Sequence, residues 1–80
     1  MNPVWIVDDD RSIRWVFEKA LARESIPFKS FASATEAMAT LAAGQMPRVL
    51  VSDIRMPGHS GLDLLRQVKA QWPELPVIIM

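Results

Sequence analysis

Aspartates stand at two places in the chain where together they would suit a metal ion. Asp8, Asp9 and Asp10 are adjacent and follow an apolar run at 3–7, and Asp53 stands near the end of a second apolar run at 48–54. Carboxylates this close repel one another, and each resists ionisation beside its neighbours. A hard divalent cation would offset that repulsion, and Mg²⁺ takes oxygen ligands. The pattern favours a Mg²⁺ site if the fold brings Asp53 to Asp8 and Asp9.

The elements that must position these residues follow from hydrophobic periodicity. Short apolar or alternating runs predict four strands, at 3–7, 27–31, 48–54 and 75–80. After Asp10 the period becomes helical, and Asp10 is placed to cap the helix. The apolar face of that helix is predicted to consist of Ile13, Val16, Phe17, Ala20 and Leu21.

Two further helices have start signals of their own. Ser33 with Glu36 forms a capping box, and Gly44 is a suitable stop for the helix between them. Ser60 with Asp63 repeats the box and predicts a helix over 61–72. The apolar stripe of this last helix is predicted to consist of Leu62, Leu65, Val68 and Trp72.

Strands that alternate with helices predict an α/β fold, a doubly wound parallel sheet with helices on both faces. In the strand order second, first, third, fourth, the first and third strands are neighbours and flank the point where ligands collect. Asp8, Asp9 and Asp53 would then share one crevice. Pro57 disfavours helical backbone at Met56, so the Arg55 carbonyl would be held where it can add an oxygen ligand. The alternative for this segment is an ordinary strand-to-helix loop.

Composition excludes several classes of function. The 80 residues make at most one small domain, and nine basic against nine acidic residues leave no electrostatic footprint for nucleic acid or an anionic membrane. The chain has no cysteine and no apparent signal peptide or membrane span, which favours a cytoplasmic protein. The apolar strand at 75–80 would need a covering helix, so we expect the native chain to continue. Strand exchange between two copies would give a homodimer.

The motifs in this order resemble the receiver domain of two-component response regulators. The resemblance rests on "IVDDDRS", "LVSDIRMPGHSGLDLL" and "LPVIIM" and extends over residues 1–80, and "VDDDRSIRWVFEKAL" with "SDIRMPG" is most similar to the nitrogen-regulation branch. It implies a flavodoxin-like (βα)5 receiver fold, of which residues 1–80 are the part up to the fourth strand. It also implies control of transcription through domains outside these residues.

The resemblance assigns roles residue by residue. Asp53 matches the phosphoacceptor, which takes a phosphoryl group from a histidine of a sensor kinase. Asp8 and Asp9 match the acidic pair that holds Mg²⁺ together with Asp53, Asp9 directly and Asp8 through water, and the Arg55 carbonyl completes the protein ligands. Asp10 keeps its capping role. The family's hydroxyl residue and lysine would follow Met80, so this chain is expected to bind Mg²⁺ weakly and to phosphorylate poorly.

Two other functions fit parts of the pattern. A Mg²⁺-dependent phosphohydrolase with an aspartyl nucleophile commonly has a second acid two residues after it, where this chain has Arg55. A pseudo-receiver that only binds partners would not need Asp8, Asp9 and Asp53 together. His59, the only histidine, is more typical of an exposed loop residue than of a Mg²⁺ ligand.

Overall fold

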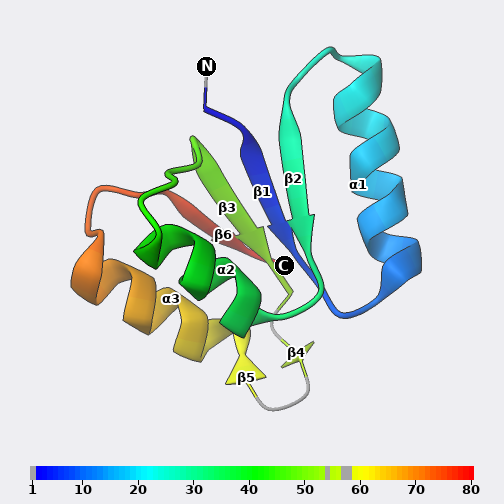
Figure 1. Cartoon of the computed structure of the whole chain (residues 1–80). Coiled ribbons are helices and arrows are strands. Elements are labelled where there is room, and N and C mark those ends of the chain that lie inside the picture. Colours follow the sequence, from blue (N-terminus) through cyan, green and yellow to red (C-terminus); the bar gives the residue numbers. More distant parts are fainter. Residues whose placement is uncertain (1, 54, 57–58) are drawn as a thin grey trace.

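The computed structural model describes residues 2–53, 55–56 and 59–80, with the backbone alone for 55–56 and 59–61. Helices and strands alternate along the first half of the chain, and a pair of very short strands precedes the last helix (Figure 1). In chain order the elements are β1 (Val4–Val7), α1 (Arg11–Arg23), β2 (Phe28–Phe31), α2 (Ala34–Ala42), β3 (Val49–Ser52), β4 (Arg55–Met56), β5 (His59–Ser60), α3 (Gly61–Gln71) and β6 (Val77–Ile79).

The main sheet is parallel and has the order β2-β1-β3-β6, which confirms the predicted order of the strands. Val7, the last residue of β1, is in register with Phe31 of β2 and Ser52 of β3. The carboxyl ends of these three strands therefore meet at one edge of the sheet. Whatever follows Val7 and Ser52 in the chain is placed side by side there.

Helix caps explain where two of the helices begin and end. The Asp10 carboxylate accepts from the Ser12 amide at 2.8 Å and, more weakly, from Ile13, which confirms its predicted role as the N-cap of α1. Ser33 accepts from the Glu36 amide at 3.3 Å at the start of α2. Gly44, with φ of 101°, adopts the left-handed conformation that ends this helix at low steric cost.

The core lies between the sheet and the α2–α3 layer. Trp5 and Leu50 on the sheet are fully buried with Leu64 and Val68 of α3, and the Trp5 and Phe31 rings lie 4.9 Å apart. The predicted stripe of α3 is wrong in one respect. Leu62 is 48 % exposed, and Leu64, one turn before the buried Val68, packs in the core instead. The buried face of α3 runs through Leu64 and Val68, because residues four apart lie on the same side of a helix.

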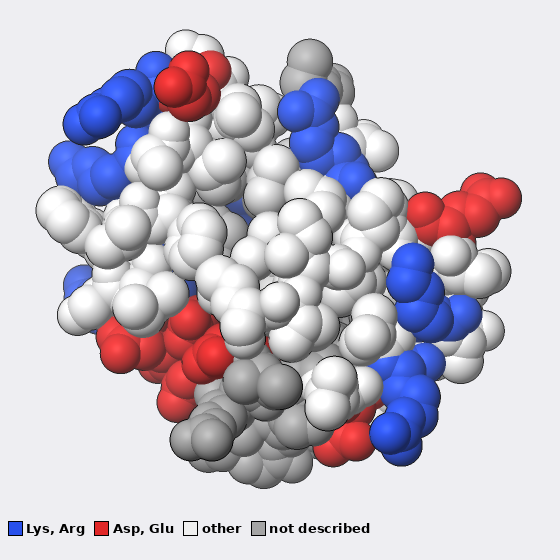
Figure 2. All heavy atoms as spheres, turned by 180° about the vertical axis from the view of Figure 1, so that it is seen from behind, with Lys and Arg blue, Asp and Glu red and all other residues white. Residues whose placement is uncertain are grey.

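The other face of the sheet is covered only in part. Helix α1 lies against β2 and β1, where the Ser30 hydroxyl donates to the Glu18 carboxylate, but α1 has no buried residue. Ile13 and Val16 are 40 % and 57 % exposed, and on the uncovered part of the sheet Ile78 is 53 % exposed. The view from behind shows a broad uncharged area with charged side chains around it (Figure 2).

The predicted helices on both faces of the sheet are confirmed, with α1 on one face and α2 and α3 on the other (Figure 1). Within the described residues, α1 lies over β2 and β1 and leaves the β3–β6 part of its face open. The apolar face of α1 is therefore not packed at Ile13 and Val16. Within the same described part of the chain, each helix is too short or too polar to span a lipid bilayer.

Between β3 and α3, where the sequence indicated a connection with Pro57 in it, the structure contains a short strand pairing. Arg55 pairs with Ser60 and Met56 with His59 in an antiparallel arrangement. Pro57 lies outside the described residues, and Met56, which Pro57 was predicted to keep out of helical backbone, belongs to β4. Helix α3 begins at Gly61, as predicted.

Candidate metal centre

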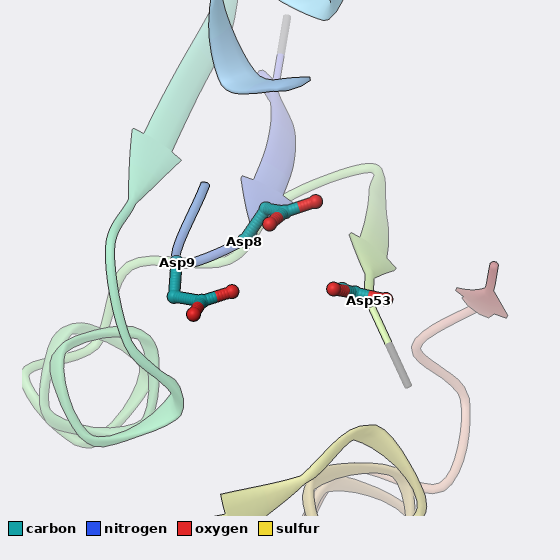
Figure 3. Close-up of side chains that lie close together, drawn as sticks. All are labelled: Asp8, Asp9 and Asp53. Carbon is teal, nitrogen blue, oxygen red and sulfur yellow. The ribbon is translucent and has the colours of Figure 1, made fainter. Parts of the chain in front are cut away.

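Three of the four aspartates that the sequence singles out come together at the carboxyl edge of the sheet. Asp8, Asp9 and Asp53 each offer a carboxylate oxygen, and these oxygens all lie within 4.8 Å of one another. Figure 3 shows Asp8 and Asp9 in the segment that follows β1 and Asp53 at the end of β3, with the carboxylates of Asp9 and Asp53 directed toward each other. Residues 44 positions apart in sequence thus form one oxygen-lined cluster.

Backbone hydrogen bonds hold both sides of the cluster in place. The Asp53 amide donates to the Val7 carbonyl at 3.0 Å, which ties the end of β3 to the end of β1. The Asp8 amide donates to the Phe31 carbonyl at 3.1 Å, which ties the same edge to β2. The parallel register of the sheet therefore fixes where both segments leave it.

The segment from Asp8 to Asp10 is held by side chains as well. The Asp10 amide donates to Oδ1 of Asp8 at 2.8 Å, and Nη1 of Arg14 donates to the Asp8 carbonyl at 2.5 Å. Asp10 itself turns its carboxylate to the first turn of α1. It is thus separated from the cluster by its capping role, although it is adjacent to Asp9 in the chain.

The three carboxylates differ in exposure. Asp8 is 2 % exposed, Asp53 is half-buried and Asp9 is exposed. Burial raises the pKa of Asp8 above its ordinary value, and the nearby negative charges of Asp53, Asp9 and Asp10 add to this, while the hydrogen bond from the Asp10 amide opposes it. Ionisation of Asp8 therefore costs more free energy in the folded protein than in the unfolded chain.

The donor set fits a hard divalent cation. All three side chains supply oxygen, and among the residues that the structure describes no lysine or arginine forms an ion pair with any of them. Mg²⁺ prefers carboxylate oxygen and keeps several waters, so a cluster open on the Asp9 side suits it. A cation there would balance charge that the protein leaves unbalanced.

The remaining predicted ligand has less support. Arg55 begins β4 two residues after Asp53, so its backbone lies close in sequence to the cluster, and a ligand role for its carbonyl stays a prediction. The His59 side chain lies outside what the structure describes. Sequence reasoning missed Arg14, for which the available signal was a long cationic side chain one turn into a helix that follows an acidic segment.

Comparison with known proteins gives a consistent picture. The model of the response regulator receiver domain matches residues 4–80. The DNA-binding transcriptional regulator NtrC of Salmonella typhimurium is 56 % identical over 77 residues, which are 96 % of this chain and 16 % of that protein. The C4-dicarboxylate transport transcriptional regulatory protein DctD of Rhizobium meliloti is 44 % identical with the same coverage.

Solved structures agree in fold. The apo receiver domain of nitrogen regulatory protein C matches with a TM-score of 0.86 and 54 % identity, over 99 % of this chain and 63 % of that one. The beryllofluoride-activated NtrC receiver domain matches with a TM-score of 0.83 at the same identity and coverage. The chain thus spans about one sixth of the curated relatives and under two thirds of these solved receiver chains.

Proposed function

The chain belongs to the response regulator receiver family, and from this membership we propose that it is a phosphoacceptor domain of two-component signalling. Asp53 takes a phosphoryl group from a phosphohistidine of a sensor kinase, with Mg²⁺ held by Asp8, Asp9, Asp53 and the Arg55 carbonyl. The observation that carries the proposal is the meeting of the Asp8, Asp9 and Asp53 oxygens within 4.8 Å. A receiver domain is not a conventional enzyme, since it is itself the substrate that is modified.

The proposed transfer is a displacement at phosphorus. One oxygen of the Asp53 carboxylate forms a bond to phosphorus while the bond from phosphorus to the kinase imidazole nitrogen breaks, and the electron pair of that bond stays with the nitrogen. A bound cation supplies charge that offsets the phosphoryl oxygens. The protein's own contribution is positioning, because the Asp53 backbone is fixed by its hydrogen bond to Val7.

Exposure and hydrogen bonding favour Asp53 as the acceptor over its neighbours. Asp8 is buried, and one of its oxygens accepts the Asp10 amide. Asp53 is half-buried at the tip of a strand, and within the described residues its carboxylate accepts no hydrogen bond. A phosphodonor can therefore approach Asp53 more readily than Asp8.

Acetyl phosphate with Mg²⁺, followed by intact-protein mass spectrometry, tests the acceptor. We expect slow addition of one phosphoryl group to the wild type, since the family's hydroxyl and lysine are not among these 80 residues. Asp53→Asn should add none, while Asp10→Asn, which changes a neighbouring acid outside the cluster, should label like the wild type. Equal labelling of Asp53→Asn and the wild type would refute the assignment, and rapid labelling of the wild type would refute the expected slowness.

The main alternative is a Mg²⁺-dependent phosphohydrolase with an aspartyl nucleophile. Arg55 stands where such enzymes commonly carry their second acid, so the sequence gives no group for general acid catalysis there. We expect no turnover of a small phosphate ester. A pseudo-receiver is the other alternative, and loss of Mg²⁺ binding on Asp9→Asn would argue against it.

The partner, the cellular location and the output complete the proposal. A sensor histidine kinase is the proposed phosphodonor, and the cytoplasm is the proposed location. The proposed output is the regulation of transcription, since the relative NtrC is named a DNA-binding transcriptional regulator. The chain's zero net charge gives no support for direct nucleic-acid contact by this domain or for membrane association. Association of two copies stays a prediction, supported by the open edge of β6.

A further inference from the structure

We infer that Arg14 is a positioning residue for the metal-binding segment, in that it fixes the peptide unit between Asp8 and Asp9 and so aligns both carboxylates. The inference rests on the proposed Mg²⁺ site. Arg14 is the fourth residue of α1, and its amide donates to the carbonyl of the N-cap Asp10 at 3.1 Å. From there Nη1 reaches back to the Asp8 carbonyl at 2.5 Å.

The Asp8 carbonyl belongs to the planar peptide unit that joins Asp8 to Asp9. Holding this oxygen fixes the rotation of the whole unit, and with it ψ of Asp8 and φ of Asp9. Asp8 has a second restraint, because its Oδ1 accepts the Asp10 amide at 2.8 Å. Within the described residues the Asp9 carboxylate accepts no hydrogen bond, so its direction depends on the backbone that Arg14 holds.

Arg14 donates to a backbone carbonyl although carboxylates lie close to it. Arg14 lines a cleft of about 440 Å³ together with Glu18 and Glu36, which are carboxylates that an arginine ordinarily pairs with. Glu18 instead accepts from the Ser30 hydroxyl, and Glu36 accepts weakly from the Ala32 amide. The guanidinium therefore lies against the segment that carries Asp8 and Asp9, although acidic partners line the same cleft.

Charge and position make opposite predictions for the removal of Arg14. A guanidinium near the cluster repels a bound cation, so loss of its charge alone would strengthen Mg²⁺ binding. Loss of the restraint on the Asp8–Asp9 peptide would weaken it, as happens when groups that orient metal ligands are removed. The direction of the change in affinity therefore separates the two roles.

Arg14→Met, Arg14→Lys and Arg11→Met are compared with the wild type by calorimetric titration with Mg²⁺ at fixed ionic strength. Arg11 is the matched control, because it is in the same helix, lines the same cleft and has no hydrogen bond to the segment within the described residues. We expect Arg14→Met to weaken binding about tenfold and Arg14→Lys to recover to within about threefold. Arg11→Met should bind as tightly as the wild type or slightly more tightly.

A second measurement is made without metal. Amide hydrogen exchange at Asp10 reports the bond to Asp8, and we expect it to accelerate several-fold in Arg14→Met and to stay unchanged in Arg11→Met. If Arg14→Met melts below the assay temperature, Arg14→Gln replaces it. The glutamine side chain is too short to reach the Asp8 carbonyl, and it keeps a polar group on the helix.

Three results would overturn the role of Arg14. The first is a Mg²⁺ affinity of Arg14→Met that equals or exceeds that of the wild type. The second is a loss of affinity in Arg14→Met that Arg14→Lys does not recover. The third is an exchange rate of the Asp10 amide that is unchanged in Arg14→Met. Absence of Mg²⁺ binding by the wild type would instead overturn the proposed metal site. In that case the exchange measurement alone decides whether Arg14 orders the segment.

Discussion

Replacing Asp8 by asparagine is expected to stabilise the metal-free protein at neutral pH. The Asp8 side chain is almost fully buried, and its carboxylate lies within 4.8 Å of an Asp53 oxygen. Asparagine has nearly the same shape, and its Oδ1 can still accept the Asp10 amide. The substitution therefore removes a buried charge and its repulsion while it leaves the packing and the hydrogen bond in place.

The size of the effect follows from the separation of the charges. At 4.8 Å, the upper limit of the separation between the nearest ligand oxygens, two like charges repel by about 0.9 kcal/mol at the dielectric constant of water and by about 3.5 kcal/mol at an effective value of 20. Asp53 is half-buried, so solvent screens part of this. We expect a gain of about 1–2 kcal/mol in the free energy of unfolding, or about 4–16 °C in Tm for a domain this small.

The gain should depend on pH in a defined direction. The pKa of Asp8 in the folded protein is raised above its ordinary value of 3.8, so the folded state binds this proton more tightly than the unfolded state does. The wild type therefore loses stability as the pH rises through the raised pKa, and regains it as the pH falls toward 3.8. The advantage of Asp8→Asn should be full above the raised pKa and should shrink below it.

Urea unfolding in EDTA, followed by tryptophan fluorescence, measures this difference at pH 7 and near pH 4. Asp10→Asn is the matched control, since asparagine caps a helix about as well as aspartate and Asp10 lies outside the cluster. Saturating Mg²⁺ should stabilise the wild type and have little effect on Asp8→Asn. If Asp8→Asn is no more stable than the wild type at pH 7 in EDTA, or if its advantage is the same near pH 4, the electrostatic reasoning is wrong.

Two further predictions concern the fold that holds the site. Ser33→Ala removes the hydroxyl that accepts the Glu36 amide and should cost about 1 kcal/mol of stability by chemical unfolding, whereas Ser33→Asn, which can also cap, should cost much less. Leu64→Ala opens a cavity in the fully buried core and should lower the free energy of unfolding by about 2–5 kcal/mol. Ile78→Ala on the exposed sheet face should lower it by under about 1 kcal/mol in the same chemical unfolding experiment. Similar losses for the two variants would show that the sheet face is not open.

The sequence was sufficient to predict the features that depend on local chemistry. The cap at Asp10 and the left-handed stop at Gly44 follow from short-range rules, and the structure confirms them. The strand order followed from the topology of doubly wound sheets, and it is confirmed as well. The meeting of Asp53 with Asp8 was predictable as well, because parallel strands end at a common edge. Each of these inferences needs the element type and its neighbours but no details of packing.

What could not be predicted depends on contacts between distant segments. Periodicity shows that Ile13 and Val16 share a helix face, but their burial depends on whether another layer packs against that face. Leu64 was missed for the same reason, since adjacent apolar residues give two possible faces for α3. Arg14 was missed because its contact requires the backbone of the Asp8–Asp10 segment to turn its carbonyl toward the helix.

The electrostatic cost of the cluster and its expected affinity for a cation have one cause. Without a cation the folded state carries the repulsion between Asp8 and Asp53, while the unfolded chain separates these charges and is relieved of it. A bound cation removes that repulsion, and it does so only in the folded state. Part of the free energy of binding therefore restores the stability that the repulsion between the carboxylates had taken away. Substitutions that lower the repulsion should therefore weaken the stabilisation by Mg²⁺ as they raise the stability of the metal-free protein. A variant at Asp8 that gained stability and kept the full response to Mg²⁺ would show that the cation binds elsewhere.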